Sequence, residues 1–157
     1  MNDPGVIVLV TWDGGGNVPP MLALVRRLAR RGHEVRVLAT PSLGDRVVDA
    51  GLDFAAFARV PELDRTGGTA MEDQVDAFVG QLAGPELSAD VADVLDRHRP
   101  DAVVIDCMQL AAFNAAETHE VSTVALVHYL LCFASGSGLK VAIPLLNASR
   151  TALGLSR

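Results

Sequence analysis

Short runs of apolar, often β-branched residues alternate along the chain with stretches whose apolar positions recur every three to four residues. Such runs predict strands when turn residues bound them, and the longer period predicts helices that bury one face. The pattern predicts strands at Val6–Thr11, Glu34–Thr40, Asp53–Phe57, Asp101–Asp106 and Val121–Val127. It predicts helices at Pro19–Arg31, Leu43–Ala50, Met71–Ala83, Glu86–His98, Met108–Glu120 and Leu139–Leu153.

This alternation of strands and helices predicts an α/β fold, a Rossmann-like, doubly wound parallel sheet with helices on both faces. Right-handed crossovers favour the strand order 3-2-1-4-5, counted along the chain. The first and fourth strands would then be neighbours, and their carboxyl ends would open into one crevice. Residues 58–70 and Ser135–Gly138 are predicted loops. Since no linker divides the chain, residues 1–157 are predicted to form one domain.

Composition narrows the class of protein. Half of the 157 residues are apolar and only 4% are aromatic, so Val, Leu and Ala must fill the core. The net charge of −6 excludes nucleic acid as the main partner, because phosphate binding needs clustered positive charge. One basic cluster, Arg26, Arg27, Arg30 and Arg31, occupies the polar side of the first predicted helix and is expected to be a solvated face.

The two cysteines, Cys107 and Cys132, lie in apolar contexts and are expected to be buried thiols in a reducing compartment. No Cys/His cluster has zinc spacing, so no metal is expected. The N-terminus lacks the basic region of a secretory signal, and the longest apolar stretch, Val121–Ala134, is shorter than the ~20 residues of a membrane span. A cytoplasmic protein is expected, and a peripheral membrane contact stays open.

The segment Thr-Trp-Asp-Gly-Gly-Gly-Asn-Val-Pro-Pro at 11–20 joins the first predicted strand to the first predicted helix. Such a junction is a common ligand site in open α/β sheets, because backbone N–H groups and a helix N-terminus converge there. The dinucleotide pattern G-x-G-x-x-G fails, since Pro19 stands at its third glycine and no acidic residue closes the second strand. A phosphate-binding G-K-[ST] is absent.

Several segments, in order, resemble the N-terminal domain of nucleotide-sugar glycosyltransferases with the GT-B fold. That superfamily includes antibiotic and macrolide, plant-metabolite, and sterol and cell-wall lipid enzymes. The resemblance covers nearly the whole chain. It rests on Gly-Gly-Gly-Asn-Val-Pro-Pro at 14–20, Arg-Gly-His-Glu-Val at 31–35, Ala-Gly-Leu-Asp-Phe at 50–54, Pro-Asp-Ala-Val-Val-Ile-Asp at 100–106, and the segment 146–155.

The resemblance implies that the chain is one half of a GT-B fold, the acceptor-binding half of a hexosyltransferase. In that family the C-terminal domain binds most of the nucleotide-activated sugar, which is a co-substrate rather than a cofactor. The donor motif of that domain is absent from these 157 residues, so the isolated chain is expected to be inactive. The implied acceptor is an apolar small molecule or a lipid. A homo-oligomer or a partner transferase stays open.

The resemblance also assigns roles to particular residues. The family usually has a His or Asp as base where this chain has Asn17, an amide that cannot take a proton. Three residues could replace that base: Asp106 at the end of the fourth strand, Asp13 in the loop, and His128 after the fifth strand. Each also has an ordinary structural explanation. Asp106 would cap the helix from Met108, Asp13 would be a turn residue, and His128 would be structural.

Substrate-binding roles are expected for Gly14, Gly15, Gly16, Asn17, Pro20 and Tyr129. Asn17 could equally be a helix N-cap or make a loop hydrogen bond. The apolar stretch at 129–133 could line an acceptor pocket or belong to the core or an interface. Loss of the usual base makes a non-catalytic glycosyltransferase-like partner or binding protein the alternative function, and a Rossmann-like oxidoreductase is a third.

Overall fold

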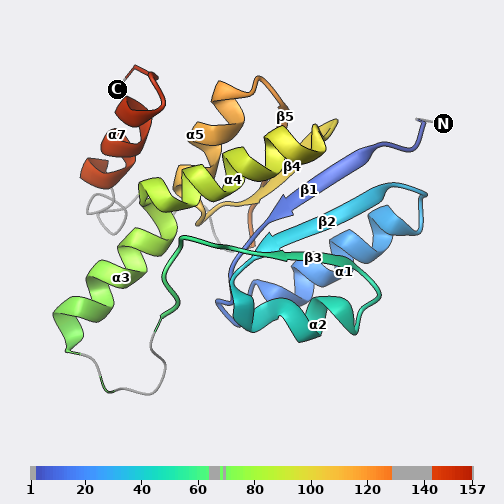
Figure 1. Cartoon of the computed structure of the whole chain (residues 1–157). Coiled ribbons are helices and arrows are strands. Elements are labelled where there is room, and N and C mark those ends of the chain that lie inside the picture. The colour runs from blue at the N-terminus through green and yellow to red at the C-terminus, as the bar shows by residue number, and fades with distance from the viewer. Residues whose placement is uncertain (1–2, 64–67, 69, 129–142, 157) are drawn as a thin grey trace.

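A five-stranded parallel sheet forms the centre of the molecule, with strand order β3-β2-β1-β4-β5, as predicted (Figure 1). The computed structural model describes residues 3–63, 68, 70–128 and 143–156. The strands are β1 Val6–Val10, β2 Glu34–Ala39, β3 Asp53–Ala56, β4 Ala102–Asp106 and β5 Ser122–Leu126. Since β1 pairs with both β2 and β4, the strand order reverses beside β1, at the point where the sequence predicts a crevice.

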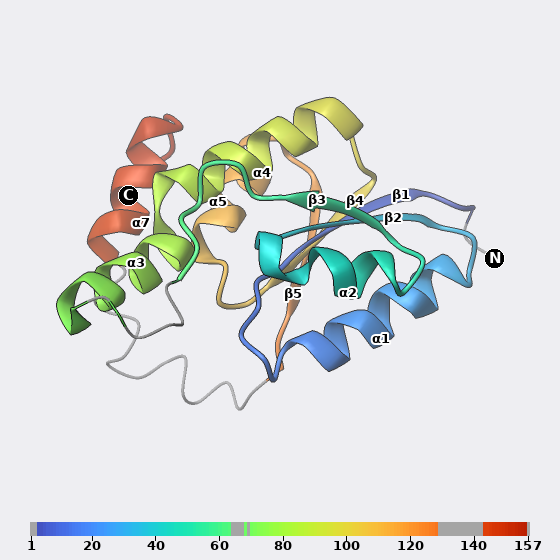
Figure 2. The same ribbon diagram turned by 60° about the horizontal axis from the view of Figure 1, so that its bottom comes forward.

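Helices cover both faces of the sheet, which confirms the doubly wound class. They are α1 Val18–Ala29, α2 Gly44–Val48, α3 Met71–Ala83, α4 Pro85–His98, α5 Leu110–Thr118 and α7 Ile143–Ala152, with a 3₁₀ turn at Pro41–Leu43. Helices α1 and α2 lie on one face, and α3, α4, α5 and α7 gather on the other (Figures 1 and 2). Within the described ranges, no helix combines the length and apolarity needed to cross a membrane.

Several predicted helix ends differ from the structure by one or two residues. The helix expected from Met108 begins at Leu110, because the N–H of Met108 donates to the Asp106 carboxylate and forms a turn before the helix. The last helix is described from Ile143, and the predicted loop Ser135–Gly138 lies outside the described residues.

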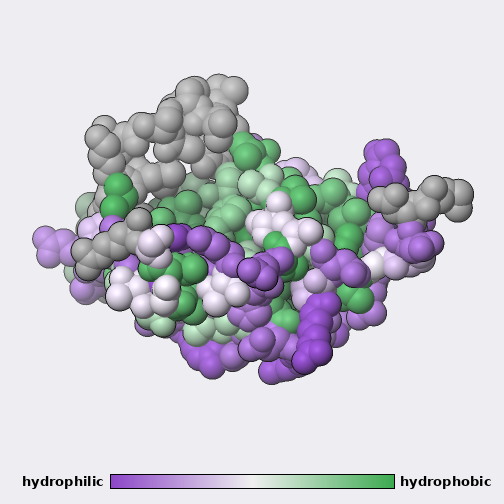
Figure 3. All heavy atoms as spheres, turned by 90° about the horizontal axis from the view of Figure 1, so that it is seen from above, coloured by the Kyte–Doolittle hydropathy of each residue, from purple (hydrophilic) through white to green (hydrophobic). Residues whose placement is uncertain are grey.

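Alternation along the strands divides the core between the two faces. Val8 and Val10 of β1 pack with Leu87 of α4 and with the alanines of α5. Ile7 and Leu9 point the other way and pack with α1 and α2. Seen from the α4 side, apolar surface continues across the middle of the molecule while polar residues dominate the lower rim (Figure 3).

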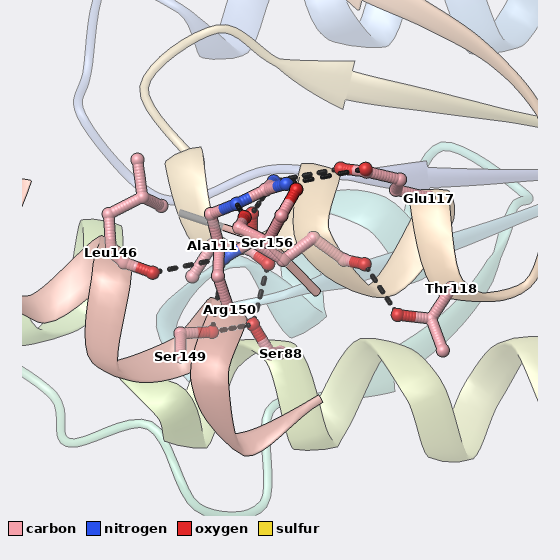
Figure 4. A network of polar contacts seen from close by, with 9 residues as sticks. Ser88, Ala111, Glu117, Thr118, Leu146, Ser149, Arg150 and Ser156 are labelled. Atoms are coloured by element: carbon pink, nitrogen blue, oxygen red, sulfur yellow. Dashed lines mark hydrogen bonds and ion pairs between the residues drawn. The ribbon is translucent and has the colours of Figure 1, made fainter. Parts of the chain in front are cut away.

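A polar network links α7 to α4 and α5 (Figure 4). Ser88 donates to the carbonyl of Ala111 at 2.6 Å and shares a 2.6 Å hydrogen bond with the fully buried Ser149. Arg150 donates from Nη1 and Nη2 to the carboxylate of Glu117, at 2.8 and 3.3 Å. Since buried hydroxyls need partners, this network fixes where α7 packs.

Acidification should remove the contribution of the Glu117–Arg150 pair. Hydrogen bonding to Arg150 lowers the pKa of Glu117 below its ordinary value of 4.5. A carboxylate whose pKa is depressed by folding stabilises above its unfolded pKa and loses that effect as pH falls through its folded pKa. Urea unfolding should therefore show Glu117→Gln less stable than wild type at pH 7 and equal to it in strong acid. Glu120→Gln, at an exposed glutamate, is the control, and an identical pH dependence for both variants would contradict this assignment.

Candidate functional site

The glycine loop between β1 and α1 forms one wall of the site, and two of its glycines are required by geometry. Gly15 has φ +77°, a left-handed conformation that strains other residues. A Cβ on Gly14 would stand 2.7 Å from the ring of Trp12, too close for any side chain. Gly14, Gly15 and Gly16 are all exposed, so their backbone faces solvent at the crevice.

The Asn17 side chain is buried, 2% exposed, and turns across the crevice to β4. Its Nδ2 donates to Asp106 Oδ2 and to the carbonyl of Trp12, both at 2.8 Å. Its Oδ1 accepts the N–H of Gly14 at 3.0 Å. Asn17 is the N-cap residue of α1, as expected, but its side chain makes no capping hydrogen bond to the helix. The expected loop hydrogen bond is confirmed.

Asp106 is the centre of the polar cluster. It is the last residue of β4 and has no exposed surface. Its Oδ2 accepts from Asn17 and from the hydroxyl of Thr11 at 3.2 Å, and its Oδ1 accepts the N–H of Met108 at 3.0 Å. The capping role expected from the sequence is therefore wrong in its detail, because the bonded N–H belongs to the turn and not to α5.

His128, two residues beyond β5, completes the cluster. Its Nε2 lies 3.0 Å from Asp106 Oδ1, and its side chain is 14% exposed. Because β1, β4 and β5 are consecutive neighbours in the sheet, their carboxyl ends bring Asn17, Asp106 and His128 together. A buried carboxylate that holds one imidazole nitrogen orients the ring, which is the arrangement that hydrolases use for a general base.

Asp13 faces a different part of the crevice. Its Oδ1 accepts the N–H of Gly15 at 3.2 Å and lies 3.9 Å from Arg46, so the predicted turn role is confirmed. The residue borders a cavity of about 160 Å³ between the loop and the end of β2. That cavity is lined by Asp13, Thr40, Ser42, Glu62, Leu63 and Gln81.

The substrate-binding roles expected for Pro20 and Tyr129 stay predictions. Pro20 is exposed in the first turn of α1, and Tyr129 lies outside the described residues. A larger cavity of about 430 Å³ opens at the opposite end of the sheet, where β4 and β5 begin, beside Pro100 and Val121. It is separated from the cluster by the length of β4 and β5 and takes no part in it.

Sequence reasoning missed Thr11 and Cys107. Thr11 ends the first predicted strand, and its position there is the one signal in the sequence; the structure shows that the residue is fully buried. The sequence predicts Cys107 only as a buried thiol, whereas the residue is partly buried and its Sγ lies within 4.8 Å of a ligand atom of both Asp106 and His128. These three side chains could together hold a cation. Only the fold reveals this, since position 128 is distant in sequence.

Comparison with known proteins finds a family match over most of the chain. Residues 15–153 match the family described as "Glycosyl transferase 4-like domain". An O-mycaminosyltylonolide 6-deoxyallosyltransferase of Streptomyces fradiae is 35% identical over 100 residues, which are 58% of this chain and 23% of that relative.

Solved structures share the fold over nearly all of this chain. The glycotransferase of kitacinnamycin has a TM-score of 0.75 at 19% identity and matches 98% of this chain and 42% of its own. The glycosyltransferase VinC, in complex with DTDP, has a TM-score of 0.71 at 16% identity and matches 97% of this chain and 45% of its own. The chain thus spans less than half of each structure. These neighbours confirm the predicted fold class, the Rossmann-like half of a GT-B fold.

Proposed function

The chain belongs to the family of glycosyl transferase 4-like domains, and on this premise we propose that it forms the acceptor-binding half of a hexosyltransferase. That enzyme would move a sugar from a nucleotide sugar to a hydroxyl group of an apolar small molecule. The observation that carries the proposal is the cluster of Asn17, Asp106 and His128 beside an exposed glycine loop. The nucleotide sugar would bind to the part of the transferase that this chain does not span.

His128 is the general base in this proposal, and Asp106 is its positioning residue. The Asp106 carboxylate is fully buried and accepts hydrogen bonds at both oxygens, so it is poorly placed to meet a substrate. His128 is partly exposed, and its Nε2–H donates to Asp106. The Nδ1 atom is then the one that accepts a proton, and the carboxylate stabilises the resulting imidazolium.

The transfer step follows from these roles. The acceptor hydroxyl gives its proton to His128 Nδ1, and its oxygen forms the new bond to the anomeric carbon of the sugar. The bond from that carbon to the nucleoside diphosphate breaks, and the diphosphate leaves with the electron pair. The DTDP in the VinC structure supports a nucleoside diphosphate as the leaving group in this fold. Asn17 holds the carboxylate in place and does not transfer the proton.

The class of acceptor is inferred from the relatives. The name of the Streptomyces fradiae enzyme gives O-mycaminosyltylonolide as its acceptor, and another neighbour is the glycotransferase of kitacinnamycin. An apolar natural-product scaffold with a free hydroxyl fits that pattern. The exposed loop at Gly14–Gly16 and the cavity beside Asp13 offer it a surface at the crevice.

Acceptor binding observed by NMR tests the proposal. A macrolide or polyphenol with a free hydroxyl should shift the amide signals of Gly14–Gly16 and the ring signals of His128. Replacing His128 by Asn should weaken that binding about tenfold, the effect of one lost hydrogen bond of about 1.4 kcal/mol. The same acceptor with its hydroxyl methylated should bind both proteins equally.

His119→Asn is the matched control, because His119 also contacts an aspartate, Asp96 at 3.2 Å, but at the other edge of the sheet. An equal loss of acceptor binding in His119→Asn and His128→Asn would overturn the proposal. So would a result in which NAD, but no acceptor, shifts the amide signals of the glycine loop.

Asn17 favours a second candidate function, a non-catalytic partner of another transferase. An amide stands where relatives in the family pattern have a base. If no acceptor binds and the chain instead raises the rate of a separate transferase, with His128→Asn as effective as wild type, this second function replaces the first.

A further inference from the structure

Cys107 brings a thiol to the Asp106–His128 pair. The cysteine directly follows Asp106, is partly buried and forms no disulfide. One ligand atom from each of Asp106, Cys107 and His128 lies within 4.8 Å of the others. A carboxylate oxygen, a sulfur and an imidazole nitrogen are three of the donors that zinc binds in proteins.

We propose that Asp106, Cys107 and His128 form a binding site for a thiophilic divalent cation such as Zn²⁺. Zinc–nitrogen and zinc–oxygen bonds are about 2.0–2.2 Å long, so ligand atoms roughly 3 Å apart can share one ion. Asp106 Oδ1 and His128 Nε2 are 3.0 Å apart. The ion would take the place of the proton between them, and the sulfur of Cys107 would be its third ligand.

Hydrogen bonds from neighbouring residues orient the Asp106 carboxylate as a metal ligand. Asp106 is held by the Thr11 hydroxyl and the Asn17 amide, both on Oδ2. Its Oδ1, which faces His128, also accepts the N–H of Met108. Outer contacts of this kind fix the direction of a ligating carboxylate and strengthen metal binding. Three protein ligands leave the fourth position of a tetrahedral ion to water or to a substrate oxygen.

Metal binding at this site releases a proton. Cys107 binds as a thiolate and releases its proton. His128 binds through Nε2, so its hydrogen moves to Nδ1 and the ring stays neutral. One proton therefore leaves the protein for each ion bound, and no oxidant or reductant is needed.

Metal binding should also switch off acceptor activation, and this consequence rests on the proposed function. With hydrogen on Nδ1 and metal on Nε2, the imidazole has no lone pair to accept the acceptor's proton. Zn²⁺ would thus inhibit a transfer that uses His128 as its base, and a chelator would restore it.

Cobalt(II) titration of the 157-residue chain tests the site without any assay of transfer. One Co²⁺ per chain should bind with a thiolate-to-cobalt charge-transfer band, Zn²⁺ should abolish that band, and one proton should appear per ion in weak buffer. Replacing Cys107 by Ser should remove the band and weaken Zn²⁺ binding at least tenfold, since even an outer-contact change costs 10–100-fold. His128→Asn should weaken Zn²⁺ binding by a similar factor.

Cys132→Ser is the matched thiol control and His119→Asn the matched imidazole control, and both should bind Co²⁺ as wild type does. Circular dichroism verifies that each variant is folded. A charge-transfer band that survives Cys107→Ser or disappears in Cys132→Ser would overturn the proposal. Binding at the three residues without any inhibition of transfer would leave the metal site in place and would argue against His128 as the base.

Discussion

Asp106→Ala should lower the free energy of unfolding by about 3 kcal/mol. The substitution removes a fully buried carboxylate that contacts Thr11, Asn17, Met108 and His128. Each buried donor left without a partner costs about 1–3 kcal/mol, although the cavity can admit water and reduce the total. Since small domains are stable by about 5–15 kcal/mol, this loss is a large part of the whole.

Urea unfolding of the 157-residue chain measures this loss. Asp106→Asn should cost less, because the amide keeps one acceptor oxygen. Asp101→Ala is the matched control: Asp101 accepts the N–H of Val6 at 2.8 Å, but at the exposed opposite end of β4. Its cost should stay near that of one surface hydrogen bond, about 1 kcal/mol. A loss for Asp106→Ala no larger than for Asp101→Ala would contradict the central place of Asp106.

Asn17→Asp should destabilise the protein by about 3 kcal/mol at pH 7, although the side chains have nearly the same shape. The amide nitrogen that it replaces lies 2.8 Å from Asp106 Oδ2, and both residues are buried. The new carboxylate would face an existing one and could donate no hydrogen bond. Two carboxylates in contact cannot both ionise cheaply, and an unpaired buried charge costs about 3–5 kcal/mol.

The penalty of Asn17→Asp should depend on pH in a definite direction. A shared site raises the folded pKa of the carboxyl pair above the unfolded value of about 3.9. Stability is then retained below the unfolded pKa and lost as pH rises through the folded pKa. Urea unfolding should show that the variant is nearly as stable as wild type near pH 4 and much less stable than wild type at pH 7.

Asn17→His tests whether the added negative charge, and not the change of side chain as such, destabilises the Asn17→Asp variant. An imidazole can donate to Asp106 and matches the family pattern. Asn17→His should therefore lower the free energy of unfolding at pH 7 by less than Asn17→Asp does. A flat pH dependence for Asn17→Asp, or equal losses for the two variants, would show that the Asn17–Asp106 contact is not maintained in solution.

Most of the fold followed from local patterns. The apolar run at Val6–Val10 and the helical period that begins at Val18 are short-range signals, and the predicted sheet order needed only the handedness of crossovers. The errors lie at element ends. The helix expected from Met108 starts at Leu110, because the Asp106 carboxylate accepts the N–H of Met108. Such a side-chain hydrogen bond competes with the helix, and the spacing of apolar residues does not reveal it.

The sequence by itself determined which candidate polar residues stand at strand ends and which end of the sheet they occupy. Asn17 and His128 follow strands and Asp106 ends one, and parallel strands place their carboxyl ends at one end of the sheet. Tertiary structure alone decided the pairing: Asp106 contacts Asn17 and His128, whereas Asp13 turns toward β2 and Cys107 joins the cluster. Contacts of about 3 Å depend on side-chain direction and burial, which sequence spacing does not encode.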